Sequence, residues 1–116
     1  MNTNAYLLGS VILLTTSVKV TSAEIRAPVD LRITNVSESH HTLVWTDSNK
    51  DETGYRIHRK QADGTWMWIG AVPSNTNTFE CGGLNGNSFY QYRVQAMVDN
   101  TEGPFSDVVS EFTLPW

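Results

Sequence analysis

Cysteine is almost absent from this chain, because Cys81 is the only one among its 116 residues. An internal disulfide is therefore impossible, and a folded domain must rely on its apolar core. An unpaired cysteine in an exported chain is either a buried, small apolar residue or a thiol open to intermolecular pairing. Cys81 ends a predicted strand, and nothing in the sequence indicates a base beside it. We therefore expect a buried Cys81 without a nucleophilic role.

Charge is also scarce, since Asp, Glu, Lys and Arg make up 17% of the residues and the net charge is −4. With a pI near 5.2, the sequence has no overall basic field that would attract nucleic acid or anionic lipid. A hydrophobic fraction of 40% is ordinary for a folded domain. These values predict one globular domain without a nucleic-acid partner.

Helical periodicity is missing from residues 24–116, which instead alternate apolar and polar residues between Gly, Pro and Asn turns. This pattern predicts seven strands, at residues 29–36, 40–46, 55–60, 65–72, 78–80, 88–98 and 105–114. Seven short strands are typical of an all-β antiparallel sandwich. We expect Trp45 at the centre of its core, facing Tyr55, Ile57, Tyr92 and Val94.

The first 23 residues differ from the rest. Residues 5–18 are uncharged and rich in Leu, Val and Ile, and small residues follow at 21–23, although no Lys or Arg precedes the apolar run. This predicts a signal peptide over 1–23, a lead-in over 24–28, a domain over 29–116, and a secreted, periplasmic or extracellular location. The alternative is an uncleaved membrane anchor, which needs about 20 apolar residues. Residues 15–17 interrupt the run and Lys19 ends it, which favours cleavage.

Catalytic motifs are absent: the sequence contains no G-x-S-x-G, H-E-x-x-H or Gly-rich phosphate loop. His40 and His41 are neighbours on one predicted strand, so their side chains point to opposite faces, and His58 belongs to another strand. The three histidines therefore do not converge on a metal, and we expect them at the surface. We expect no catalytic residue, no cofactor and no enzyme activity.

A calcium loop is the remaining metal hypothesis. Asp47, Asn49 and Asp51 have the first, third and fifth positions of an EF-hand loop. Glu52 stands at the sixth position, where glycine is required, and His58 stands at the twelfth, where a bidentate Glu is required. The sequence therefore favours an ordinary loop over a metal site.

Trp66 and Trp68 are the candidate ligand-contact residues, because two aromatic side chains on one strand face can stack on sugar rings or anchor a protein. Their direction depends on the hairpin turn at Asp63-Gly64. A two-residue turn directs both toward the core, whereas a three-residue loop sends Met67 and Ile69 inward and exposes both Trp side chains. Turn chemistry favours the first alternative, whereas Ile69, which has the character of a core residue, favours the second, so both stay open. We expect at least one of the two Trp residues at the core or its rim.

Several motifs in order resemble a fibronectin type III domain over residues 28–115. They are WTDSNKDETGYRIHR, DGTWMWIGAV, a Leu six residues before a Tyr in LNGNSFYQYRVQA, and NTEGPFSDVVS. The resemblance implies a seven-stranded, immunoglobulin-like sandwich in which Tyr90 hydrogen-bonds back across the preceding turn. Two departures from the family pattern are Trp68 and Cys81, at positions where polar residues are usual.

These features predict a non-catalytic, exported module that mediates protein or cell-surface interaction through its loops and sheet edges, or acts as a spacer. The alternative is a carbohydrate-binding accessory module with Trp66 and Trp68 as its aromatic platform. A third hypothesis is a spacer within a larger extracellular enzyme. We expect the partner to be a protein or a surface polysaccharide, and the membrane to be involved only if residues 1–23 remain attached.

Overall fold

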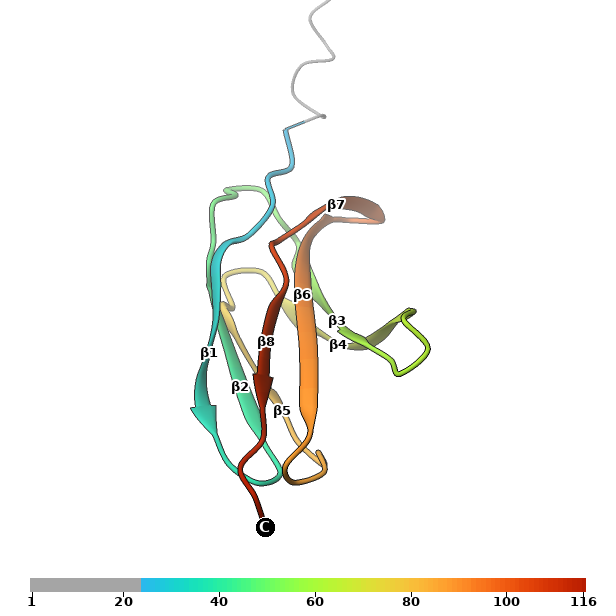
Figure 1. The fold of residues 1–116 in the computed structure, drawn as a ribbon. Coiled ribbons are helices and arrows are strands. Elements are labelled where there is room, and N and C mark those ends of the chain that lie inside the picture. Colours follow the sequence, from blue (N-terminus) through green and yellow to red (C-terminus); the bar gives the residue numbers. More distant parts are fainter. Residues whose placement is uncertain (1–23) are drawn as a thin grey trace, which may run out of the picture.

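The computed structural model describes residues 24–116, and the predicted signal peptide lies outside them. Eight strands form two antiparallel sheets that face each other (Figure 1). Residue 24 and the C-terminus lie at opposite ends of this sandwich (Figure 1). Within the described residues, no helix has the length and apolar character needed to cross a membrane.

The smaller sheet has three strands in the order β1-β2-β5. They are β1 (Val29–Val36), β2 (His41–Thr46) and β5 (Thr78–Cys81). The larger sheet has the order β4-β3-β6-β7, and β8 also pairs with β6. Its strands are β3 (Gly54–Lys60), β4 (Trp66–Pro73), β6 (Phe89–Val98), β7 (Thr101–Phe105) and β8 (Val109–Phe112). Strand β4 thus forms one edge of the larger sheet.

The core lies between the sheets, as the alternation of apolar residues predicts. Trp45 is 1% exposed, and its ring centroid lies 5.4 Å from that of Tyr55 in the facing sheet. Ile57, Tyr92 and Val94 belong to the same buried cluster. The predicted role of Trp45 is confirmed.

The sequence predicts a single last strand, but the structure divides this region into β7 and β8. Between them, Ser106 is buried and donates its backbone N–H to Val94 O at 2.7 Å. Its hydroxyl oxygen accepts the Val94 N–H at 3.0 Å and donates to Asp107 O. A side chain thus replaces a carbonyl in the ladder, so the segment stays beside β6 while its regular pairing is interrupted.

The turn before β6 has the predicted tyrosine contact. Tyr90 Oη accepts a hydrogen bond from the backbone N–H of Asn85 at 2.9 Å. Leu84, just before this turn, is buried. The contact ties the start of β6 to the chain that precedes it.

The prediction that all three histidines lie at the surface is wrong for His41, which is fully buried. His41 Nδ1 lies 3.0 Å from Tyr92 Oη, and Nε2 lies 3.1 Å from Phe112 O. Because a carbonyl can only accept, Nε2 carries the donated proton. His41 therefore links β2 to β6 and to β8 across the core. His40 is exposed and His58 is half-buried.

Candidate binding surface

The loop between β3 and β4 has three residues, Ala62 to Gly64, rather than two. Gln61 N–H donates to Thr65 O at 2.7 Å, which closes the loop, and Gly64 adopts a φ of +90°. Asp63 accepts hydrogen bonds from the hydroxyl and backbone N–H of Thr65, and these bonds lower the pKa of the Asp63 carboxyl. Of the two loop lengths that the sequence left open, the structure has the longer one.

This loop fixes the register of the hairpin, with Lys60 opposite Trp66 and His58 opposite Trp68. Met67 and Ile69 consequently face the space between the sheets, while both indoles lie on the outer face of the larger sheet. Trp68 is 57% exposed. The expectation was that at least one Trp lies at the core or its rim. Neither belongs to the core cluster, although Trp66 is half-buried against Arg93.

Arginine side chains cover part of each indole. The Arg56 guanidinium lies 4.6 Å from the Trp68 ring centroid, and the Arg93 guanidinium lies 4.3 Å from that of Trp66. Arg93 also lies 3.7 Å from the ring centroid of Phe105 in β7. Each of these contacts is a cation–π interaction. Aromatic and cationic groups therefore alternate across β4, β3, β6 and β7.

We define the outer face as the side chains that the strand register places on this side of the larger sheet. Its surface residues are Arg56, His58, Lys60, Trp66, Trp68, Phe89, Gln91, Arg93, Glu102, Phe105, Ser110 and Phe112. Phe89 and Phe112 form a cross-strand pair with ring centroids 5.0 Å apart, and both are more than half exposed. The outer face thus presents exposed aromatic surface at both β4 and the β6–β8 ladder.

His58 lies in the middle of this face and contacts Phe105, with ring centroids 5.0 Å apart. Burial, and then the positive charges of Arg93 and Arg56, lower the pKa of His58. The imidazole is therefore neutral at pH 7. It contributes a polar ring to the face but no charge.

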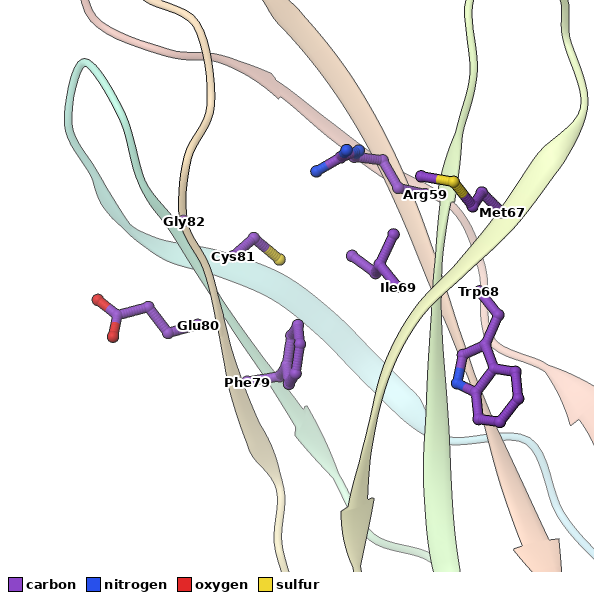
Figure 2. A pocket seen from close by; sticks show the side chains of 8 residues that line it. All are labelled: Arg59, Met67, Trp68, Ile69, Phe79, Glu80, Cys81 and Gly82. Carbon is purple, nitrogen blue, oxygen red and sulfur yellow. The ribbon is translucent and has the colours of Figure 1, made fainter.

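A recess of about 450 Å³ opens between the edge strands β4 and β5. Figure 2 shows Ile69, Phe79 and Cys81 directed into the space between the strands, whereas Trp68 lies on the opposite side of β4. The Phe79 ring lies against the bare backbone of Gly70, where an added Cβ would collide with it. The recess and the outer face are therefore on different sides of β4.

Cys81 is 3% exposed, as expected for a small apolar residue. Burial raises the pKa of its thiol to about 11, which suppresses the reactive thiolate at neutral pH. Arg59, on the same side of the recess, places its guanidinium 5.3 Å from the Tyr90 ring centroid. This arrangement does not activate a nucleophile.

The loop with EF-hand-like spacing uses its side chains for its own hydrogen bonds. Asp47 Oδ1 accepts the backbone N–H of Asn49 at 2.9 Å, and the Asn49 amide bonds both backbone groups of Arg26. Glu52 is buried, and its Oε2 accepts the Asn75 N–H at 3.1 Å. In residues 24–116, no group of three or more His, Cys, Asp or Glu side chains could hold a metal ion.

The sequence named Trp66 and Trp68 but missed the arginines and phenylalanines that surround them. Alternation in β6 already places Arg93 opposite in direction to Tyr92 and Val94. Its position between Trp66 and Phe105 depends on the registers of three strand pairs. The length of the β3–β4 loop would have given the first of these registers, and the sequence does not determine the other two.

Two packed antiparallel sheets with this topology define an immunoglobulin-like β-sandwich. The sequence model of the fibronectin type III domain matches residues 26–112, and the chain belongs to this family. Members of this family are generally non-catalytic interaction or spacer modules.

Solved structures agree with this assignment. The sixth fibronectin type III domain of human fibronectin type III domain containing protein 3 is 26% identical, with a TM-score of 0.68, and the match covers 84% of this chain and 93% of that domain. A β-1,2-glucanase from Parabacteroides distasonis is 24% identical, with a TM-score of 0.70. That match covers 81% of this chain but 13% of the glucanase. Chicken CNTN1 domains FN1–FN3 are 22% identical, with a TM-score of 0.69, over 79% of this chain and 32% of theirs.

Proposed function

We propose that this chain is a non-catalytic, exported binding module that contacts a protein or a surface polysaccharide through the outer face. The observation that carries the proposal is the exposure of Trp68, Phe89 and Phe112 on a single sheet face. Exposed aromatic side chains grouped on one side of a domain mark interaction sites more often than a scattered distribution does. This location replaces the loops and sheet edges that the sequence suggested.

The position of the chain ends is compatible with a module inside a longer assembly. The segment before β1 and the C-terminus lie at opposite ends of the sandwich, and the larger sheet runs between these ends (Figure 1). Connections at the two ends would leave the outer face uncovered. A spacer role and a binding role are therefore compatible in the same chain.

Carbohydrate binding is the second candidate, and it is favoured by one observation. The Trp68 indole is 57% exposed, although Arg56 lies over its ring. The open part of such a ring can stack on the apolar C–H face of a sugar. One of the similar structures is a β-1,2-glucanase, and the part of its chain that matches has the same fold as this domain.

Binding of the full chain to a panel of immobilised extracellular proteins and polysaccharides tests the proposal. We expect Trp68→Ser to weaken binding by about tenfold or more, because exposed Trp and Arg residues carry most interface energy. Val29→Ser is the matched control, since Val29 is 49% exposed on the other sheet. Equal losses in both variants, or no binding by the wild-type chain, would contradict a binding role for the outer face.

A further inference from the structure

Charge is distributed unevenly between the outer face and the rest of the chain. The outer face has three of the seven basic residues within 24–116, namely Arg56, Lys60 and Arg93. Of the twelve acidic residues, only Glu102 lies on it. A protein that is acidic overall thus presents one locally basic side. Charge complementarity favours an anionic partner on this side.

Arg93 is positioned to bind an anion with the edge of its guanidinium. The guanidinium carbon lies 4.3 Å from the Trp66 ring centroid and 3.7 Å from the Phe105 ring centroid, so two aromatic rings hold this group in place. Its Nε is buried without a hydrogen-bond partner, so the terminal Nη groups are the donors that a ligand can reach. Among the described residues, Arg93 has no carboxylate partner and makes no side-chain hydrogen bond. The two terminal Nη groups of a guanidinium can together bind a carboxylate or a sulfate.

The neighbouring cations extend this site. Arg56 lies over Trp68 and is 3.4 Å from the Glu102 carboxylate, with its side chain 29% exposed. Lys60 is exposed and pairs with Trp66 across the hairpin. Each indole of β4 therefore has a basic side chain beside it. The backbone positions of the two Trp residues are about 7 Å apart along the strand, because a strand rises about 3.3 Å per residue.

We propose that the outer face binds an acidic polysaccharide, whose sugar rings stack on Trp68 and whose anionic groups pair with Arg93, Arg56 and Lys60. This inference rests on the proposed binding role of the outer face. Each unit of a repeating acidic sugar provides an apolar C–H face and a negative group, which matches the alternation of aromatic and basic side chains. An acidic peptide provides the charge but no ring that would use the exposed indole.

A binding assay with the full chain tests this inference on four immobilised probes. Polygalacturonate provides carboxylates on sugars, and dextran sulfate provides sulfates on sugars. Uncharged dextran controls for the sugar, and poly-L-glutamate controls for the charge. We expect binding to polygalacturonate, dextran sulfate or both, at least tenfold tighter than to either control. Preference between the two acidic sugars identifies the anionic group.

Charge reversal locates the site, because two variants change the net charge equally. We expect Lys60→Glu to weaken binding to the acidic sugar at least tenfold. Arg32→Glu is the control, since Arg32 is exposed on β1 and pairs there with Asp30. We expect binding of Arg32→Glu to match that of the wild type. Equal losses in the two variants would overturn the assignment to the outer face.

Removal of the acidic group from the outer face provides a gain-of-binding test. Glu102→Gln releases Arg56 from its ion pair, so we expect tighter binding to the acidic sugar. Glu80→Gln removes one exposed acid on β5 and is expected to bind as the wild type does. Wild-type binding should also weaken between about 0.01 M and about 1 M salt, as the screening length falls from about 30 Å to about 3 Å. Binding that does not change with salt would overturn the role of the cations.

The outcomes separate this inference from the proposed function. If poly-L-glutamate binds as tightly as the acidic sugars, the ligand need not be a sugar, and the inference is wrong. If uncharged dextran binds as tightly, negative groups are not needed, and the inference is also wrong. Binding to another partner that is sensitive to Trp68→Ser, without affinity for any acidic sugar, would overturn this inference and leave the proposed function in place. The absence of any partner would overturn both.

Discussion

Lys60 pairs with Trp66 across the β3–β4 hairpin, and this pairing sets the direction of the side chains that follow in β4. A register shifted by one residue would send both indoles inward and expose Met67 and Ile69. The three-residue loop therefore decides whether the larger sheet has an aromatic outer face. The composition of β4 alone does not decide it.

The loop conformation can be tested at Gly64, whose φ of +90° is strained for residues with a side chain. No atom lies within 4 Å of an added Cβ, so Gly64→Ala causes no steric clash. It destabilises the fold only through the strain of the positive φ. We expect it to lower the free energy of unfolding by about 1 kcal/mol. Gly64→Asn is expected to cost less, because Asn tolerates positive φ. Chemical denaturation measures both, and equal stability of Gly64→Ala and the wild type would contradict the strain.

Trp45 is the second test, because no disulfide compensates for loss of its packing. Truncation of a buried Trp costs about 3 to 5 kcal/mol, which is a large part of a domain stability of about 5 to 15 kcal/mol. We therefore expect Trp45→Ala to leave the chain mostly unfolded or to lower its melting temperature strongly. Trp68→Ala is the control and should melt close to the wild type. A cooperative melt of Trp45→Ala within a few degrees of the wild type would contradict the core assignment.

Cys81 gives a pH-dependent prediction. Burial raises the pKa of its thiol to about 11, so the folded state favours the protonated form. Burial of the protonated thiol therefore contributes fully to the folding stability below the pKa of the unfolded thiol. This contribution is lost as the pH rises toward 11. We expect alkylation of the native chain by iodoacetamide at pH 8 to be at least tenfold slower than that of the denatured chain, as mass spectrometry can follow. Equal rates would show that the thiol is accessible in the native state.

Sequence patterns predicted most of the strands because alternation directly reflects burial on one side of a sheet. The predicted span of β1 is the observed one, and the core role of Trp45 follows from the same alternation. His41 shares a face with Leu43 and Trp45, so alternation also indicated its burial. Its polar side chain argued for the surface instead. Two hydrogen bonds across the core make that burial possible, and these depend on residues far along the chain.

The outer face was less predictable than the fold. The side chains of Arg93, Trp66 and Phe105 meet across strands, so their contacts require the registers of β3–β4, β3–β6 and β6–β7 together. The turn at Asp63-Gly64 is compatible with two loop lengths, and the interruption at Ser106 comes from a hydroxyl that bonds to β6. The net charge is a sum over the whole chain, so it did not predict that the outer face is locally basic. Local contacts of this kind are set by tertiary structure.

The contact between Gly70 and Phe79 has a consequence for sequence variation at the open edge of the sandwich. An aromatic ring from one sheet occupies the volume that any side chain at position 70 would need. In a saturation library selected for folding, we expect glycine to be retained at position 70, while the exposed neighbour Ala71 accepts many residue types. A single missing side chain thus sets how closely these two edge strands can approach.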